Sequence, residues 1–262
     1  DYWNADAINF DSVTFLPIPD TTVRLANLQS GDIDMLERLA PTDLAQANAD
    51  DSITVVSAVS LGYQGITFNV GNGEKSETPW GQDKRLRQAF SYAMDRDAIN
   101  QVVFEGAYAP GNQPYPNVSP WYDDEFPIEA RDVEKAKALL AEAGYPDGID
   151  LTVQVPNTTI PLQLMQVVQS MAAEAGIRIE IVSKEFATLL ADQSAGDYQA
   201  SQIGWSGRGD PDGNIHRAIL IDEAPLVYLY HQSWITAFDS KIEGFTAYPD
   251  GMIRLEGVTL SE

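Results

Sequence analysis

The segment 205–214, WSGRGDPDGN, holds the side chains of this sequence that are best suited to bind or transform a small molecule. The indole of Trp205 can stack on a ligand, and the guanidinium of Arg208 offers a fixed fork of donors for a carboxylate or for hydroxyls. A structural interpretation competes with this one, in which Trp205 packs in the core and Arg208 pairs with Asp210 or Asp212. The spacing of the residues leaves both interpretations open.

A metal site is not expected, either in this segment or elsewhere. A calcium loop that began at Asp210 would need glycine at its sixth position and glutamate at its twelfth, but Ile215 and Ile221 stand there. The sequence has no cysteine and only two histidines, His216 and His231, which excludes zinc–thiolate sites and leaves little for a histidine site. We therefore expect a turn of Pro, Asp and Gly here, and neither a metal nor another cofactor.

A hydrolase is the second class of function that the segment suggests. Residues 204–208, GWSGR, nearly match the nucleophile motif G-x-S-x-G, with Arg208 in place of the last glycine. Ser206 would act with His216 or His231, but the order of acid and histidine along the chain does not favour a catalytic triad. Binding without catalysis is the preferred function, and the hydrolase stays as the alternative.

Charge and hydropathy exclude several classes of partner. The chain has 262 residues, with 16 Lys and Arg against 39 Asp and Glu, so its formal net charge is −23. Such a chain repels nucleic-acid phosphates and anionic membranes, and its acidic residues are spread out as on a solvated surface. No apolar run approaches the roughly eighteen residues of a membrane-spanning helix. The start, DYWN, has no basic and apolar leader pattern, so we expect no signal peptide in this sequence.

Helices and strands alternate regularly in the middle of the chain. Apolar periodicity, broken by Gly and Pro, predicts helices at 132–143, 161–175 and 185–194, and strands at 151–155, 177–182 and 198–205. This order predicts right-handed crossovers and a mainly parallel sheet. Ligands of such sheets bind beyond the carboxyl ends of the strands, which is where the segment 205–214 begins.

The other predicted elements flank this region. Apolar and β-branched runs predict strands at 13–18, 53–59, 65–70, 226–230 and 258–260. A long helical pattern covers 84–100, and Asp95 is expected to cap a second helix that ends at Gly106.

Six stretches, in order, resemble the extracellular solute-binding proteins of peptide-type ABC importers, family 5. They are 10–35 (FDSVTFLPIPDTTVRLANLQSGDIDM), 63–69 (YQGITFN), 85–99 (RLRQAFSYAMDRDAI), 132–148 (DVEKAKALLAEAGYPDG), 204–214 (GWSGRGDPDGN) and 224–231 (APLVYLYH). The resemblance covers essentially the whole chain, and 85–99 is its most specific stretch.

The resemblance implies an α/β fold of the periplasmic-binding-protein type, with one complete lobe and part of the other. The implied division is a partial first lobe at 1–62, a second α/β lobe at 63–215 and a return to the first lobe at 216–262. We further expect 65–212 to form the ordered core, and 1–59 to pack with 226–262. Closure of two lobes would bury the solute between them.

The resemblance also implies a function and a location. The chain would be the substrate-binding component of an ABC importer that captures a peptide-like or other small polar solute and delivers it to the permease. It would not be an enzyme. It would work in the periplasm or outside the cell, associated with the membrane only through the permease or an anchor missing from this sequence.

The resemblance implies ligand-binding residues, among which one departure bears on specificity. They are Tyr63, Gln64, Asn69, Trp205, Ser206, Arg208 and Asp210. The di- and oligopeptide binders have an aspartate shortly after this Trp that pairs with the amine of the peptide, where Arg208 stands here. A cation cannot serve an ammonium group, so the ligand would carry a carboxylate or hydroxyls, as in an acidic peptide derivative, an opine or a saccharide. Asp210 takes the role of the aspartate if the loop shifts.

A second departure concerns the length of the chain. Members of the family are longer, and residues 216–223, HRAILIDE, join segments that the family separates, with the junction expected near Ala218. Such a truncated and internally shortened chain would leave apolar strands uncovered. A fragment that no longer binds is therefore a further alternative.

Overall fold

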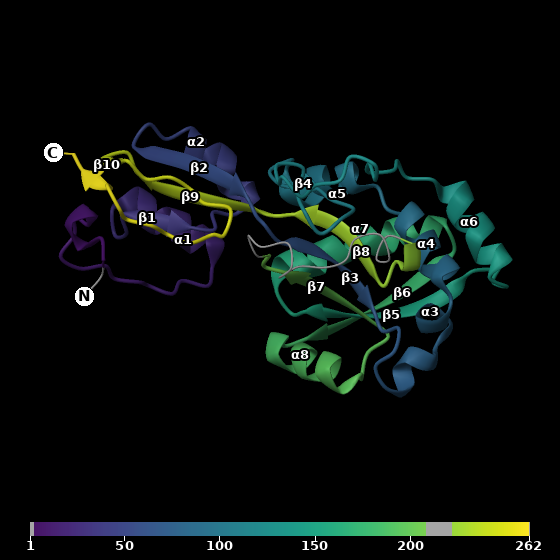
Figure 1. Cartoon of the computed structure of the whole chain (residues 1–262). Coiled ribbons are helices and arrows are strands. Elements are labelled where there is room, and N and C mark those ends of the chain that lie inside the picture. Colours follow the sequence, from purple (N-terminus) through teal and green to yellow (C-terminus); the bar gives the residue numbers. More distant parts are fainter. Residues whose placement is uncertain (1–2, 208–221, 262) are drawn as a thin grey trace. The chain divides into compact units, whose positions relative to one another are not determined.

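The computed structural model describes residues 3–207 and 222–261, which form two compact units (Figure 1). The smaller unit combines the two ends of the chain, residues 1–60 and 233–262, and the larger unit is residues 61–232. The chain therefore passes from one unit to the other at Ser60–Leu61 and returns at Gln232–Ser233.

The smaller unit is built on a three-stranded antiparallel sheet. Its order is β1 (Met35–Glu37), β9 (Ser233–Asp239) and β2 (Ile53–Val59), so the C-terminal strand lies between two N-terminal ones. The helices are α1 (Thr21–Ser30) and α2 (Leu44–Asn48), with short 3-10 turns η1 (Ala5–Ala7) and η2 (Pro41–Asp43). A small ladder of β10 (Ile242–Glu243) and β11 (Thr259–Leu260) completes it. Phe238, Ile242 and Val258 form its small core with Phe10 and Phe245 packed against them.

The strand predicted at 13–18 does not form. These residues have no ladder partner, and the side chain of Phe15 is 75% exposed. β-branched and aromatic residues favour a strand only where a neighbouring strand accepts their hydrogen bonds, and Pro17 and Pro19 supply no N–H. The prediction of this strand is therefore wrong.

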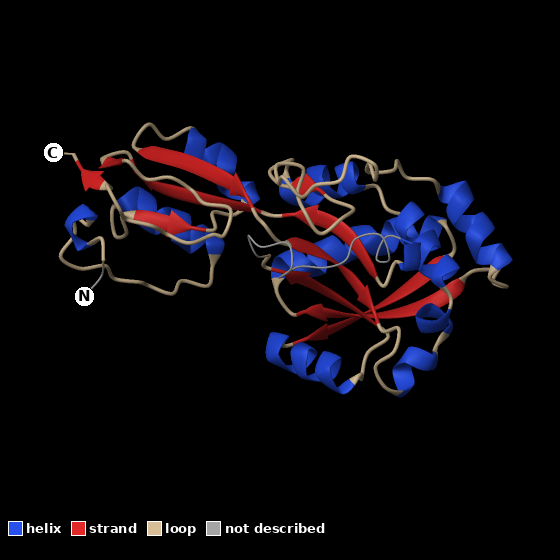
Figure 2. Ribbon diagram, in the orientation of Figure 1, coloured by secondary structure: helices blue, strands red, loops and turns tan. Residues whose placement is uncertain are grey.

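The larger unit is built on a six-stranded mixed sheet (Figure 2). Its order is β4 (Ala109–Pro110), β8 (Leu226–His231), β3 (Tyr63–Phe68), β7 (Ala200–Trp205), β5 (Ile149–Pro156) and β6 (Ile177–Lys184). β7, β5 and β6 are parallel, as the alternation of helices and strands predicts, whereas β3, β8 and β4 pair antiparallel. The prediction of a mainly parallel sheet is thus only half right, because β3 directly follows the connection from the smaller unit and β8 directly precedes the return to it, and both pair antiparallel.

The crossover helices α7 (Thr159–Glu174) and α8 (Phe186–Ala195) cover opposite faces of this sheet. On β5, Leu151 and Val153 join the main core with Leu164 of α7, whereas Gln154 donates from Nε2 to Asp192 of α8 at 3.2 Å. The remaining helices are η3 (Glu74–Glu77), α3 (Pro79–Gln82), α4 (Lys84–Tyr92), α5 (Arg96–Phe104) and α6 (Val133–Glu142).

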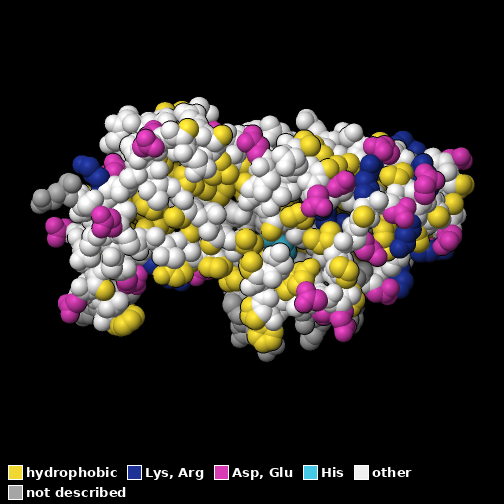
Figure 3. Space-filling model, turned by 90° about the horizontal axis from the view of Figure 1, so that it is seen from above, with side chains coloured by type: hydrophobic (Ala, Val, Ile, Leu, Met, Phe, Trp, Pro, Cys, Tyr) yellow, Lys and Arg dark blue, Asp and Glu magenta, His cyan; other side chains and the backbone are white. Residues whose placement is uncertain are grey.

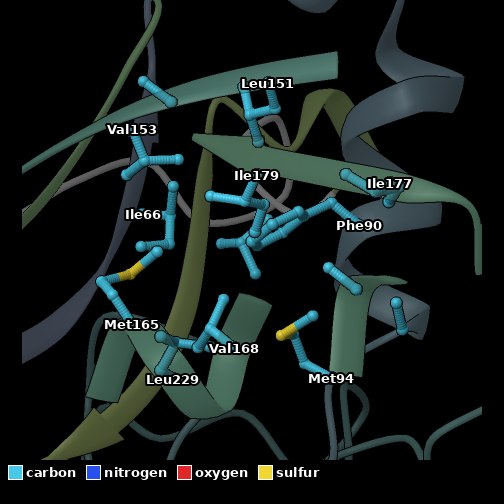
Figure 4. Close-up of a cluster of buried hydrophobic side chains, with 14 of the residues drawn as sticks. Ile66, Phe90, Met94, Leu151, Val153, Met165, Val168, Ile177, Ile179 and Leu229 are labelled. Carbon is cyan, nitrogen blue, oxygen red and sulfur yellow. The ribbon is translucent and has the colours of Figure 1, made fainter. Parts of the chain in front are cut away.

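The main core lies between the sheet and helices α4, α5 and α7. Figure 4 shows Ile66 of β3 and Leu229 of β8 meeting Phe90, Met165 and Val168 of the helices. The predicted break after α4 is confirmed, since the carboxylate of Asp95 accepts a hydrogen bond from the Ala98 amide at 2.9 Å and starts α5.

The return to the smaller unit lies later in the chain than expected. β8 was expected to pack with the N-terminal residues, but it pairs with β3 inside the larger unit, with Ile66 opposite Val227. The return follows Gln232 instead of beginning at 216 or 226. The expected junction near Ala218 falls outside the described residues.

Candidate functional site

Two of the predicted ligand-binding residues, Tyr63 and Trp205, are direct partners across the β3–β7 ladder. Tyr63 is the first residue of β3 and Trp205 the last of β7, so they lie at the end of the sheet where the chain enters from the smaller unit. Directly opposite residues of an antiparallel pair project to the same face. The side chain of Tyr63 is buried, and Trp205 is 39% exposed. Ser206 follows at once and is exposed.

Gln64 lies at the same end of the sheet but on its other face. It stands opposite Gly204, and its side chain lies so close that a methyl group built on Gly204 would come within 2.3 Å of the Gln64 amide. The Gln64 amide oxygen accepts a hydrogen bond from Gln202 at 3.4 Å. Because side chains alternate along a strand, Gln64 shares the face of Ile66 and the main core rather than that of Tyr63.

Asn69 is not brought to this site. It follows the opposite end of β3, where its Nδ2 donates to the carbonyls of Asn72, Gly196 and Tyr198 at 2.8, 3.2 and 3.0 Å. Its Oδ1 accepts from the Asn72 amide at 2.9 Å, and the residue is 1% exposed. It lies six positions after Tyr63 along the chain, which is roughly 20 Å at about 3.3 Å per residue of strand. Its place in the chain thus makes Asn69 a buried link between two loops.

Tyr228 of β8 lies beside Tyr63 on the same face, although the sequence did not single it out. The two rings meet edge to face, with centroids 4.8 Å apart and planes at 83°. Burial raises the pKa of Tyr63 to about 12 and raises that of Tyr228 still further, with smaller effects on the latter from Tyr63 and Tyr115. The buried Tyr228 hydroxyl has no hydrogen-bond partner among the described residues. The site therefore combines the exposed Trp205 with two buried tyrosines, one of which has no hydroxyl partner among the described residues.

Two glycines that sequence analysis also missed hold the strand ends together. A methyl group on Gly62 would lie 2.0 Å from the carbonyl oxygen of Trp205, and one on Gly207 would lie 2.3 Å from the carbonyl carbon of Leu61. Gly207 also has a φ of +77°, which favours glycine. The signal in the sequence was a single glycine at the edge of each strand, which often marks close approach of two backbones.

His231 does not have the features of a general base. Its Nδ1 lies 2.6 Å from the carbonyl oxygen of Gly62, and the ring is 1% exposed. Burial lowers its pKa to about 4, against smaller opposite effects from the backbone at Gly62 and Gln113. Arg208, Asp210 and His216 lie outside the described residues. Within the described parts of the chain, no group of acidic and histidine side chains could hold a metal ion.

The charged side chains do not mark a further site on the face seen in Figure 3. Asp and Glu side chains are scattered over that face with Lys and Arg among them. This distribution suits a solvated acidic surface, as the composition predicted. Among the described residues, no helix is both long enough and apolar enough to span a membrane.

The fold is that of periplasmic binding proteins. A dipeptide-binding protein from Pseudoalteromonas sp. SM9913 in complex with Met-Leu superposes with a TM-score of 0.76 at 21% identity, over 93% of this chain and 57% of that one. AgaA from A. tumefaciens R10, in complex with agropinic acid, superposes with a TM-score of 0.72 at 23% identity, over 93% and 59%.

The sequence places the chain within one family of such proteins. Residues 1–219 match the bacterial extracellular solute-binding proteins, family 5, in the middle region of that family. The chain belongs to this family, and the predicted resemblance is confirmed. The dipeptide-binding protein of Escherichia coli K12 is 32% identical over 217 residues, which are 80% of this chain and 39% of that protein. Heme-binding protein A of Haemophilus influenzae is 32% identical over 218 residues, 80% and 38%.

The chain thus spans about two fifths of the length of these curated relatives. The relatives are named for binding and not for catalysis. The family is described as extracellular, and the structural relatives share the periplasmic binding fold.

Proposed function

We propose that this chain is part of the substrate-binding component of an ABC importer, and that it captures a peptide-like or other small polar solute for delivery to the permease. The observation that carries the proposal is the half-exposed Trp205, paired with Tyr63 at the end of the sheet where the chain enters the larger unit. Family membership and the names of the relatives support the peptide class. The protein performs no reaction on its solute.

Each residue of the site has a distinct role in this proposal. Trp205 stacks on the solute, and Tyr63 and Tyr228 form the buried surface beside it. The Tyr228 hydroxyl lies buried behind this surface with no partner among the described residues, at a desolvation cost of about 1–3 kcal/mol. Ser206 is exposed next to Trp205 and supplies a hydroxyl.

Arg208 sets the charge preference of the site in this proposal. It follows Trp205 by three residues and supplies a cation where the peptide binders of the family carry an aspartate. A carboxylate of the solute, in an acidic peptide derivative, an opine or a saccharide acid, pairs with it. The agropinic acid held by the similar AgaA structure is consistent with an acidic solute. Asp210 serves a free amine if the loop shifts.

Titration calorimetry on the 262-residue chain tests the proposal, with Met-Leu and agropinic acid as probes. We expect Trp205→Ala to weaken the binding of whichever probe binds by tenfold or more, because a base-sized aromatic contact is worth about 1–3 kcal/mol. Trp121→Ala is the matched control, since Trp121 is 44% exposed in the same unit and lies in a different segment. Equal affinities for the two variants would remove Trp205 from the site.

The Arg208→Asp variant tests whether the site prefers a solute with a carboxylate or one with a free amine. The variant should weaken the binding of the acid and strengthen that of the peptide with a free amine. No change for either probe would make Arg208 a surface or structural residue. If neither probe binds to the unaltered chain, the alternative of a fragment without binding activity is favoured. Ester turnover that disappears in Ser206→Ala would favour the hydrolase instead.

A further inference from the structure

The two segments that connect the larger unit to the smaller one are joined to each other inside the larger unit. Leu61 and Gly62 begin this unit, and His231 and Gln232 end it. The imidazole Nδ1 of His231 lies 2.6 Å from the carbonyl oxygen of Gly62. A carbonyl oxygen can only accept, so Nδ1 carries the hydrogen and donates it.

The His231 ring is held from its other side as well. Ala109 of β4 is its ladder partner, and a methyl group on Gly111 would lie 2.7 Å from the ring atoms Cδ2 and Nε2. The buried guanidinium of Arg96 fixes this wall, since its Nε donates to the carbonyls of Gly111 at 3.0 Å and Tyr228 at 2.9 Å. The ring therefore has no room to turn away from Gly62.

Gly62 in turn touches the backbone that carries both aromatic residues of the candidate site. It precedes Tyr63 directly, and its α-carbon packs on the carbonyl of Trp205 so closely that no side chain fits between them. Its carbonyl is thus the point at which β8 can fix the position of the β3 and β7 strand ends together.

We propose that His231 is a positioning residue of the solute site, which acts through the Gly62 carbonyl to hold Tyr63 and Trp205 in their binding arrangement. The inference rests on the function proposed above, because it concerns the same site. It assigns to a buried histidine, weighed above as a metal ligand and as a catalytic base, a role in which the ring never touches the solute.

Two substitutions of His231 separate its hydrogen bond from its bulk. His231→Phe keeps a ring but removes the donor, whereas His231→Asn places an amide donor close to the position of Nδ1. The matched control is Gln169→Met, which removes a donor 2.7 Å from the Ile179 carbonyl, where α7 meets the far edge strand β6. Calorimetry with Met-Leu and agropinic acid gives the affinity, and amide hydrogen exchange of the ligand-free protein gives the local protection of 61–64 and 203–206.

We expect His231→Phe to weaken the binding of the probe tenfold or more and to speed exchange in both segments by a similar factor. His231→Asn should stay within about threefold of the unaltered chain in both measurements, a free-energy difference of about 0.7 kcal/mol. Gln169→Met should leave the affinity and the exchange of these two segments unchanged, even if it lowers the melting temperature as much as His231→Phe does.

The two measurements keep this inference apart from the proposed function. If the unaltered chain binds neither probe while exchange responds as expected, the proposed function fails and the fixing of the strand ends by His231 stands. Equal exchange and equal affinity for His231→Phe and His231→Asn would overturn the inference. An equal loss of affinity in His231→Phe and Gln169→Met would also overturn it, because general destabilisation would then explain the effect.

Discussion

Acidification should destabilise this protein through His231 in particular. Burial lowers the pKa of the folded-state imidazole from 6.5 to about 4. Between these two pH values the unfolded chain binds a proton at this residue that the folded chain does not bind. The free energy of unfolding therefore falls as the pH falls from 6.5 to about 4, and the contribution of His231 is complete above that window.

The structure sets the size of this effect. One pKa unit corresponds to 1.36 kcal/mol, so His231 contributes about 3 kcal/mol across the whole window. This is a large part of the free energy of unfolding of a folded domain, which is typically about 5–15 kcal/mol. Arg96, which holds the Gly111 backbone, and Tyr63, which follows Gly62, have pKa values of about 10 and about 12 and do not titrate in the window.

Urea unfolding at pH 7.0, 5.5 and 4.5 measures the effect when the unaltered chain is compared with His231→Asn. Carboxylates such as Asp83 and Asp197, whose pKa values are lowered by Arg85 and Lys75, lose their stabilisation in acid in both proteins and cancel in the difference. We expect the unaltered chain to lose about 2–3 kcal/mol more than His231→Asn between pH 7.0 and 4.5. Parallel curves, or a greater loss in His231→Asn, would refute the reasoning.

Three further predictions concern other parts of the chain. Gly62→Ala should lower the free energy of unfolding in urea by about 2–4 kcal/mol, because its methyl group would lie 2.0 Å from a backbone oxygen. Gly31→Ala, which has open space but a φ of +78°, should cost only about 1 kcal/mol, and equal costs would contradict the steric argument. Asn69→Ala should lower the free energy of unfolding by about 2–4 kcal/mol, since four hydrogen bonds are lost, two of them buried and two partly buried; a change under about 0.5 kcal/mol would show that the loops hold without it. Replacing Phe15 and Leu16, 75% and 58% exposed, with Ser should reduce self-association in light scattering, whereas a strictly monomeric unaltered chain would contradict the expectation that this segment seeks a partner.

Local patterns in the sequence determined the elements whose causes are local. The helix pair divided at Asp95 was predictable, because an N-cap carboxylate and an apolar stripe act within one or two turns. The alternation of helices and strands over 132–205 also determined that β5, β6 and β7 are parallel, since connections of this kind almost always cross over in one hand. The same patterns, together with the six stretches that resemble the family, were sufficient to predict the class of the protein.

Contacts between residues distant in the chain decided strand pairing, register and close backbone approach, which local sequence patterns could not predict. The run at 13–18 has the composition of a strand and finds no neighbour, whereas β9 finds two and becomes the centre of its sheet. Register decided the candidate site: it set Trp205 opposite Tyr63 and left Asn69 at the far end of the same strand. The fit of Gly62 against a carbonyl is a close approach between segments more than 140 residues apart. Side-chain type and spacing carry no information about such distances, because the packing of the whole unit fixes them.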